Sequence, residues 1–307
     1  MAVVTSVNIS TEKGTIKTPV KSIYLKKGVG IEGDAHRGNW HRQISLLAVE
    51  SINKMNDLGV QNLHPGIFAE NITTKGIKLS TLPVGTILKI GQGMVVMTQI
   101  GKKCHKGCDI FKQVGKCIMP YEGVFAKVIV EGNVGIGDEI RVIDKPSVGI
   151  IIISDKGYRN EREDQVIPIL SKLLGEDYVI FDTIIIPDEK NQITETMKRM
   201  IDIDKIDIVI SSGGTGLSPR DVTPEATKLI LEREIPGISE ALRYQSMQYT
   251  KFACLSRGLC GTRGESLIIN LPGSPKAINQ CMGYIKEILP HCIETIKGKA
   301  YECATCL

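Results

Sequence analysis

Apolar strands alternate with helices in the second half of the chain, and no other feature constrains the fold as strongly. Runs rich in apolar residues at Val148–Ile153, Tyr178–Ile186 and Ile206–Ser212 predict buried strands. The segments between them, Gln165–Leu174 and Gln192–Ile203, predict helices. Apolar strands must be covered on both faces, so we expect an α/β domain with a parallel or mostly parallel sheet and helices on both of its faces.

The first half has a different texture, because short strand-like runs are separated by glycine. Only Ser45–Met55 predicts a helix there, and residues 132–138 predict a glycine-rich turn. We therefore expect a β-rich, barrel-like domain at residues 1–145, followed after a polar linker at Asp144–Ser147 by the α/β domain at residues 146–307. The predicted strands of the first domain are Val3–Ile9, Ile87–Ile90, Met94–Ile100, Gly123–Val130 and Glu139–Ile143.

Composition excludes several classes of protein. The chain has 307 residues and a net charge of +4, with 5% aromatic residues, and no basic stretch is interleaved with aromatics as in nucleic-acid binders. The small positive excess is compatible with an anionic small-molecule substrate. No apolar run approaches the ~20 residues of a membrane span, and no secretory signal is evident. We expect a cytoplasmic protein whose nine cysteines are reduced thiols.

A glycine-rich loop in the second half is the first candidate site. Three glycines stand within Gly213–Gly216, between a predicted strand and a helix predicted at Pro224–Glu234 with Thr223 as its cap. Such a loop turns backbone N–H groups toward an anion. A glycine turn without a ligand is the alternative, but the carboxyl end of a strand is where open α/β sheets bind ligands. The loop has no closing Lys-Ser or Lys-Thr, so it is not a Walker loop.

Three further segments follow predicted strands and supply matching chemistry. They are Ser154–Asp155, Pro187–Glu189 and Asn270–Pro275; the last follows a strand at Ser266–Ile269 and opens a helix through Leu289 that Ser274 caps. Together with the loop they place carboxylates and anion cradles along one sheet edge. Nucleotidyl transfer needs backbone donors for phosphates and carboxylates that hold Mg²⁺.

These residues resemble the molybdopterin adenylyltransferase family in order and spacing, from about Val148 to Tyr301. The resemblance implies an α/β fold, often trimeric, that binds molybdopterin and MgATP and releases adenylylated molybdopterin and pyrophosphate. It implies that Asp188 and Asp221 are the essential acidic residues, which we assign as catalytic and as Mg²⁺ ligands. The segments that carry it are Gly149–Asp155, Ile186–Glu189, Gly213–Gly216, Asp221–Thr223, Leu255–Arg257 and Asn270–Pro275.

Substrate-binding residues follow from the same positions. The resemblance implies that the binding loops include Gly213, Gly214, Thr215, Ser256, Asn270, Pro272 and Gly273. From their places beside these loops and strand ends, we add Ser154, Asp155, Gly216 and Ser274.

The second candidate site is a cysteine segment in the first half. Lys102, Lys103 and Lys106 flank Cys104, and nearby positive charge favours the nucleophilic thiolate. A metal site is the alternative, with the spacing of its four candidate ligands poor for zinc. Those ligands are Cys104, His105, Cys108 and Cys117, and for Cys117 we favour simple burial.

The first half, from about Thr5 to Ile143, resembles the MOSC domain, a module also found in molybdenum-cofactor sulfurases. The resemblance implies a β-barrel-like fold, a pterin-cofactor pocket and a cysteine that carries sulfur as a persulfide. We place that catalytic role at Cys104, with Cys108 as second choice, and expect His36 and His41 to be exposed loop residues. The resemblance rests on Gly30–His36, Arg42–Leu47, Gly66–Ile72, Gly123–Ala126 and the Cys104 segment.

Both halves indicate molybdenum cofactor biosynthesis. We expect the C-terminal domain to transfer AMP from ATP to molybdopterin, and the N-terminal domain to bind the pterin cofactor or carry its sulfur. A non-catalytic carrier or storage protein is the alternative. Expected partners are the two small-molecule substrates, a sulfur donor or a molybdenum insertion protein, and further copies of the chain in a homo-oligomer, with a trimer implied by the resemblance. The tail at Cys303–Cys306 is expected to be frayed.

Overall fold

The computed structural model describes residues 1–102 and 117–299, and the chain divides into two compact units, Met1–Asp144 and Lys145–Leu307. Within the described ranges, no helix is both long enough and apolar enough to cross a membrane.

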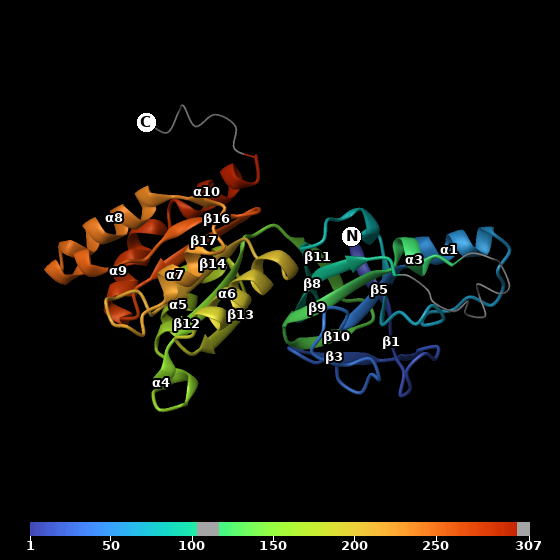
Figure 1. The fold of residues 1–307 in the computed structure, drawn as a ribbon. Helices are drawn as coiled ribbons and strands as arrows, with labels where there is room; N and C mark the ends of the chain where they lie inside the picture. The colour runs from blue at the N-terminus through green and yellow to red at the C-terminus, as the bar shows by residue number, and fades with distance from the viewer. Residues whose placement is uncertain (103–116, 300–307) are drawn as a thin grey trace. The chain divides into compact units, whose positions relative to one another are not determined.

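The first unit is built on a closed barrel of seven strands (Figure 1). The strands follow the order β11-β7-β8-β9-β5-β6-β1, and β1 pairs with β11 to complete the ring. The pairings are antiparallel except that of β5 with β6. The barrel-like fold predicted from the sequence is confirmed. The strands are β1 (Ala2–Ile9), β5 (Ile44–Ala48), β6 (Ile72–Lys75), β7 (Ile87–Ile90), β8 (Gly93–Ile100), β9 (Val124–Val130) and β11 (Glu139–Ile143).

Alternation along these strands fills the barrel with aliphatic side chains, as the two-residue period of a strand requires. The interior residues Leu46, Leu88, Val95 and Val124 are all fully buried. Outside the barrel, β2 (Thr18–Val20) pairs with β1, and a small antiparallel sheet has the order β10-β3-β4. The remaining elements are β3 (Ser22–Lys26), β4 (Gly30–Ile31), β10 (Gly132–Gly135), α1 (Val49–Asp57), α3 (Met119–Glu122) and η1 (Leu79–Thr81).

Two sequence predictions in this unit are wrong in part. The predicted helix at Ser45–Met55 begins only at Val49, because residues 45–48 belong to β5, a strand with every residue buried between β6 and β9. The predicted turn at residues 132–138 is a strand, β10, as far as Gly135, and turns only after it. In both cases pairing with distant strands overrides the local signal.

The second unit contains a six-stranded, mostly parallel sheet with the order β13-β12-β14-β17-β16-β15. The first four strands are parallel, and β16 and β15 add antiparallel pairs at one edge. Every residue of β12, β14 and β17 is buried, as continuous apolar runs predict. The strands are β12 (Ser147–Ile153), β13 (Val179–Ile186), β14 (Ile208–Ser212), β15 (Arg233–Glu234), β16 (Cys260–Arg263) and β17 (Ser266–Leu271).

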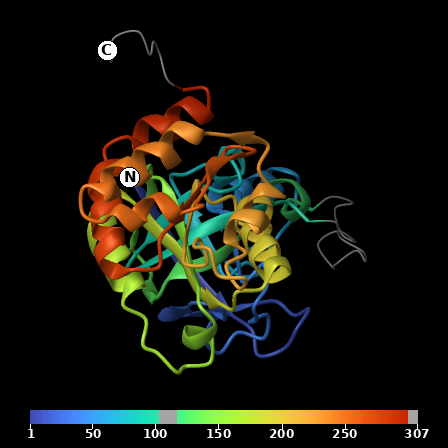
Figure 2. The ribbon, with the colours of Figure 1, turned by 60° about the vertical axis from the view of Figure 1, so that its left-hand side comes forward.

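Helices cover both faces of this sheet (Figure 1, Figure 2). On one face Ile150 shares a core with α5 (Val166–Leu174), α8 (Pro236–Met247), α9 (Pro275–Ile285) and α10 (Leu289–Ile296). On the other face, a Cβ added at Gly149 would lie 2.7 Å from the sulfur of Met200, so η3 packs directly on the strand. The predicted α/β architecture is confirmed. The elements on this second face and in the loops are α6 (Lys190–Lys198), η3 (Arg199–Ile203), α7 (Thr223–Lys228), α4 (Asp155–Tyr158), η2 (Gly175–Asp177) and η4 (Lys251–Leu255).

Helix boundaries account for the differences from prediction in this unit. The helix predicted at Pro224–Glu234 ends at Lys228, and Arg233–Glu234 instead pairs with β16 as an edge strand. The helix predicted from Pro275 through Leu289 is two helices, α9 and α10. Thr223 is the first residue of α7 and not its cap, because its hydroxyl donates to the Gly213 carbonyl at 2.9 Å.

Candidate functional site

The segments predicted to form the site meet at the carboxyl edge of the second sheet. Strand register aligns Ile153 with Ile186, and Ser212 with both Ile152 and Leu271. The residues that follow these strands therefore leave the sheet at one level, in the crevice where open α/β sheets bind ligands.

The glycine loop needs glycine for two reasons. Gly213 and Gly214 have φ of +106° and +61°, a region that other residues rarely adopt. A Cβ at Gly213 would overlap the carbonyl oxygen of Ile153, and one at Gly214 would overlap the Thr223 hydroxyl. The loop is thus held against β12 and α7 with its backbone close to any molecule at the sheet edge.

Two carboxylates lie against this loop. Asp188 Oδ1 is 2.9 Å from the position of a Cβ at Gly214, and Asp221 Oδ2 is 2.9 Å from that at Gly216. Asp221 Oδ2 accepts the Ser218 N–H at 2.9 Å, and Asp188 Oδ2 accepts the Asp155 N–H at 3.1 Å. The second oxygen of each carboxylate accepts no hydrogen bond from any described residue. Each is therefore available to a cation.

The pKa values of Asp155 and Asp188 are shifted in opposite directions. Burial raises the pKa of Asp188, and the charges of Asp155 and Asp221 raise it further, against the lowering effect of a hydrogen bond from Asp155. Burial also tends to raise the pKa of Asp155, but the Asp188 N–H and the Arg220 guanidinium outweigh it, so its pKa is lowered. A bound cation therefore offsets the cost of ionising Asp188.

The chemistry of these groups fits Mg²⁺ brought with a nucleotide. No described residues form a group of three or more metal-binding side chains. Mg²⁺ in nucleotide enzymes is held by one or two carboxylates together with substrate phosphates and waters. Asp188 and Asp221 supply that number.

Two arginines, Arg220 and Arg257, support the loop, and the sequence motifs assigned neither of them to the site. Arg220 donates to Asp155 through Nε at 3.1 Å and Nη2 at 2.9 Å, and to Glu189 through Nη1 at 2.9 Å. Arg257 donates from Nε to the Gly216 carbonyl at 2.7 Å and from Nη2 to the Asp221 carbonyl at 2.6 Å. The signals that point to them are their places beside Asp221 and Ser256 in the motifs.

Seven of the predicted substrate residues line one or other of two pockets beside the loop. A cavity of about 140 Å³ is lined by Ser154 and Gly273, with the 162–166 segment opposite. A second cavity measures about 290 Å³. The predicted substrate residues that line it are Thr215, Gly216, Ser256, Asn270 and Pro272. Both cavities therefore lie next to the glycine loop.

Two predicted residues, Asn270 and Ser274, contribute in other ways. Asn270 lies inside β17, 4% exposed, and its amide donates to Ser211 at 2.8 Å and Thr227 at 3.0 Å. Its side chain therefore holds the framework as well as lining the larger pocket. Ser274 occupies the cap position of α9 without a side-chain capping bond and lines neither pocket.

The cysteine site predicted in the first unit, Cys104 and Cys108, lies outside the described residues. Cys117 is 7% exposed in an apolar cluster, as the burial hypothesis predicts. His41 is exposed, but the prediction for His36 is wrong. Its side chain is half-buried, and Nδ1 lies 3.4 Å from the Nζ of Lys17, because the chain folds back over a buried ion pair of Lys17 with Asp34.

Cationic side chains gather at the end of β8, from which the cysteine segment departs. The guanidinium carbon of Arg42 lies 4.8 Å from the ring centre of Trp40 and 5.7 Å from that of Phe125. Lys102 Nζ lies 5.9 Å from the same Phe125 ring. Arg42 Nε is buried and has no hydrogen-bond partner within the described chain. This surface can receive an anion or a flat ring.

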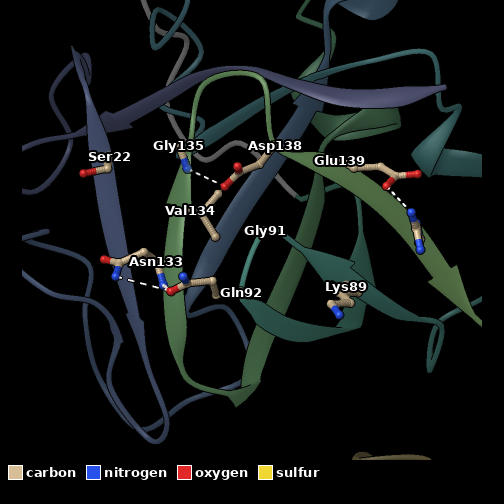
Figure 3. Close-up of a pocket in the computed structure, with 10 residues that line it drawn as sticks. Ser22, Lys89, Gly91, Gln92, Asn133, Val134, Gly135, Asp138 and Glu139 are labelled. Carbon is tan, nitrogen blue, oxygen red and sulfur yellow. Dashed lines mark hydrogen bonds and ion pairs between the residues drawn. The ribbon is translucent and has the colours of Figure 1, made fainter.

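A further cavity in the first unit is lined by none of the predicted site residues. It measures about 560 Å³ and lies between β10, β7 and β11 (Figure 3). Two of its acidic side chains have partners nearby, since Glu139 pairs with Arg141, and Asp138 accepts the Gly135 N–H at 2.8 Å.

Comparison with known proteins bears on both units. Residues 149–291 match the family model described as a probable molybdopterin binding domain, and residues 33–141 match the MOSC domain. A molybdopterin adenylyltransferase of Helicobacter pylori J99 is 37% identical over 155 residues, which are 49% of this chain and 88% of that protein. The enzyme of that name from Escherichia coli K12 is 33% identical over 172 residues, covering 51% of this chain and 88% of that protein.

Another relative is much longer than this chain. The molybdenum cofactor synthesis protein cinnamon of Drosophila melanogaster is 43% identical over 150 residues, so this chain spans only 25% of its length. Among solved structures, the molybdopterin biosynthesis enzyme MoaB of Thermus thermophilus is 39% identical with a TM-score of 0.48, covering 51% of this chain and 99% of that one. Through residues 149–291 the chain belongs to the molybdopterin adenylyltransferase family, and it joins that domain to a MOSC domain at residues 33–141.

Proposed function

We propose that this chain acts in molybdenum cofactor biosynthesis and that its second unit transfers AMP from ATP to molybdopterin in the presence of Mg²⁺. One observation carries the proposal. Asp188 and Asp221 lie against a glycine loop at the carboxyl edge of a parallel sheet, and each keeps one oxygen that no described residue engages. Two relatives named molybdopterin adenylyltransferase, each matched over 88% of its length, support the same reaction.

The proposal assigns a separate role to the loop, to the two carboxylates and to Arg257. The Gly213 N–H donates to the Leu271 carbonyl at 3.2 Å, so the backbone N–H groups of residues 214–216 are the ones that bind phosphate oxygens. The two carboxylates hold Mg²⁺. Bound there, Mg²⁺ neutralises charge that develops on the phosphates. An oxygen of molybdopterin forms a bond to the α-phosphorus of ATP as the bond to pyrophosphate breaks. Arg257 fixes the loop carbonyls, so the N–H donors stay aimed at the reacting phosphates.

Incubation of the full chain with molybdopterin and ATP tests this proposal, with pyrophosphate release as the readout. We expect release with Mg²⁺ and none after chelation by EDTA. Binding of both substrates without pyrophosphate under either condition would instead support a non-catalytic carrier.

For the first unit, we propose that the MOSC domain binds the pterin cofactor or carries its sulfur. The cations Arg42 and Lys102 beside the Phe125 ring support a site for an anionic, flat ligand, and Lys102 is two residues before Cys104 in the sequence. In this proposal Cys104, or Cys108 as second choice, receives sulfur from a donor protein, and a molybdenum insertion protein is a further partner. Mass spectrometry of the cysteine peptides after exposure to a persulfide donor tests it; an unmodified Cys104 and Cys108 would refute sulfur carriage.

We also propose that the chain forms a homotrimer. Apolar side chains on and after α8 are strongly exposed in the isolated chain, including Tyr244 at 66% and Tyr249 at 61%. Exposed apolar patches often mark protein interfaces. Light scattering on the full chain decides the matter, since a monomeric mass would exclude the trimer.

A further inference from the structure

Arg243 is the one charged side chain among the described residues that line the 290 Å³ pocket of the second unit. It projects from α8, a helix whose sequence carries no recognisable binding motif. The pocket also includes Thr215 and Ser256 from the binding loops, so Arg243 shares a cavity with predicted substrate residues.

The charge of Arg243 is not balanced by a carboxylate. Its Nη1 donates to two main-chain carbonyls, those of Ser256 at 3.5 Å and Gly258 at 3.2 Å. No described acidic residue lies within ion-pair distance of it. Half-buried arginines are ordinarily paired, because removing a charge from water is costly. The Nε and Nη2 donors of Arg243 are engaged by no described residue.

The rest of the pocket is predominantly apolar. Its walls include Leu242 from α8, Phe252 and Leu255 from η4, and Ala277 from α9. Phe252 is 67% exposed, and Lys251 Nζ lies 5.7 Å from the centre of its ring. Apolar walls with one convergent charged group suit a flat heterocycle that carries an anion. Asp188 and Asp221 do not line this cavity, so they do not repel that anion from within it.

We propose that Arg243 binds the phosphate of a phosphorylated heterocycle whose ring occupies this pocket. The inference rests on the proposed function and deepens it, because molybdopterin and ATP both have this chemistry. The carbonyls of Ser256 and Gly258 hold one edge of the guanidinium, and its remaining donors bind phosphate oxygens.

The test compares ligands with and without the phosphate. Isothermal titration of the full chain with molybdopterin and its dephosphorylated form makes one pair, and a non-hydrolysable ATP analogue and adenosine make the other. For Arg243→Met we expect affinity for the phosphorylated member of one pair to fall about 10- to 100-fold, the range of a hydrogen bond to a charged group. Affinity for its unphosphorylated partner should change less than about 3-fold.

The affected pair identifies the ligand of the pocket. Arg243→Lys, which keeps the charge but loses the planar fork, should restore part of the affinity. Lys276→Met is the matched control, because it removes a positive charge from an exposed position on α9 outside the pocket lining and should leave both pairs unchanged.

Equal losses for both members of a pair would assign Arg243 a structural role and overturn the inference, as would unchanged affinity for both phosphorylated ligands. Failure of the proposed function gives a different result. In that case the wild-type chain releases no pyrophosphate whether or not Arg243 discriminates phosphorylated ligands.

Discussion

Asp155 and Asp188 each bind the other's backbone: the Asp155 N–H donates to Asp188 Oδ2, and the Asp188 N–H donates to Asp155 Oδ1, both at 3.1 Å. This reciprocal pair joins the ends of β12 and β13 and fixes the carboxylate of Asp188 against the glycine loop. It also brings two acidic side chains together, so that one of them is costly to ionise.

The raised pKa of Asp188 predicts that removing its charge stabilises the fold, although activity is lost. In the folded chain the ionised form is disfavoured, so at pH 7 its charge opposes folding, and the penalty disappears as pH falls below the raised pKa. We expect Asp188→Asn to raise the melting temperature at pH 7 while it abolishes pyrophosphate release. The gain in melting temperature should shrink toward pH 4. A lower melting temperature at pH 7 would show that the ionised carboxylate stabilises the fold.

Gly214→Ala should damage the loop. The substitution forces alanine to φ of +61° and its Cβ onto the Thr223 hydroxyl. We expect a loss of about 1–3 kcal/mol in the free energy of unfolding, measured with urea, and loss of nucleotide binding. Gly283→Ala is the control: it lies within α9 with nothing near its Cβ, and should stabilise the chain by about 0.5–1 kcal/mol. Equal effects of the two substitutions would contradict the strained geometry.

The two domains should be separable, provided that the cut precedes Pro146. The Pro146 carbonyl accepts the Val179 N–H at 2.9 Å, and the Ser147 N–H donates to Asp207 at 2.7 Å, so both residues belong to the second unit. We expect residues 145–307 to fold alone and to bind molybdopterin. An insoluble fragment, or one without any pterin binding, would show that the units depend on each other.

Cys104 should be the most reactive thiol of its segment. If the flanking lysines favour its thiolate, it should react with iodoacetamide at pH 7 faster than Cys108 or Cys117. Cys117, buried at 7% exposure, provides the slow reference. Peptide mapping after brief alkylation measures the three rates, and labelling concentrated on Cys108 would transfer the proposed sulfur role to it.

Most of the strands could be predicted from the sequence because buried strands contain short runs rich in apolar residues. β7 and β11 have the predicted bounds, and the apolar runs of β12 and β14 became central strands. The Ser45–Ala48 run was misassigned because four apolar or small residues suit a strand as well as a helix, and only pairing with β6 and β9 decides between them.

The sequence assigned residues to the candidate site where they belong to motifs that follow predicted strands. The glycine loop and Asp221 form one motif, so local chemistry identified them. Arg243 gave no such signal, because α8, the Ser256–Gly258 loop and α9 come together only in the folded chain. The same holds for the bonds of Arg220 to Asp155, which join residues 65 positions apart.

Pyrophosphate release by Asp221→Ala, compared with the wild-type chain, tests the central claim most directly. Asp221 follows the glycine loop, and its free carboxylate oxygen is one of the two assigned to Mg²⁺. With molybdopterin and MgATP, we predict that the wild-type chain releases pyrophosphate and that Asp221→Ala slows release by about 100-fold or more while its melting temperature stays close to that of the wild type. Near-normal release by a folded Asp221→Ala would contradict the account.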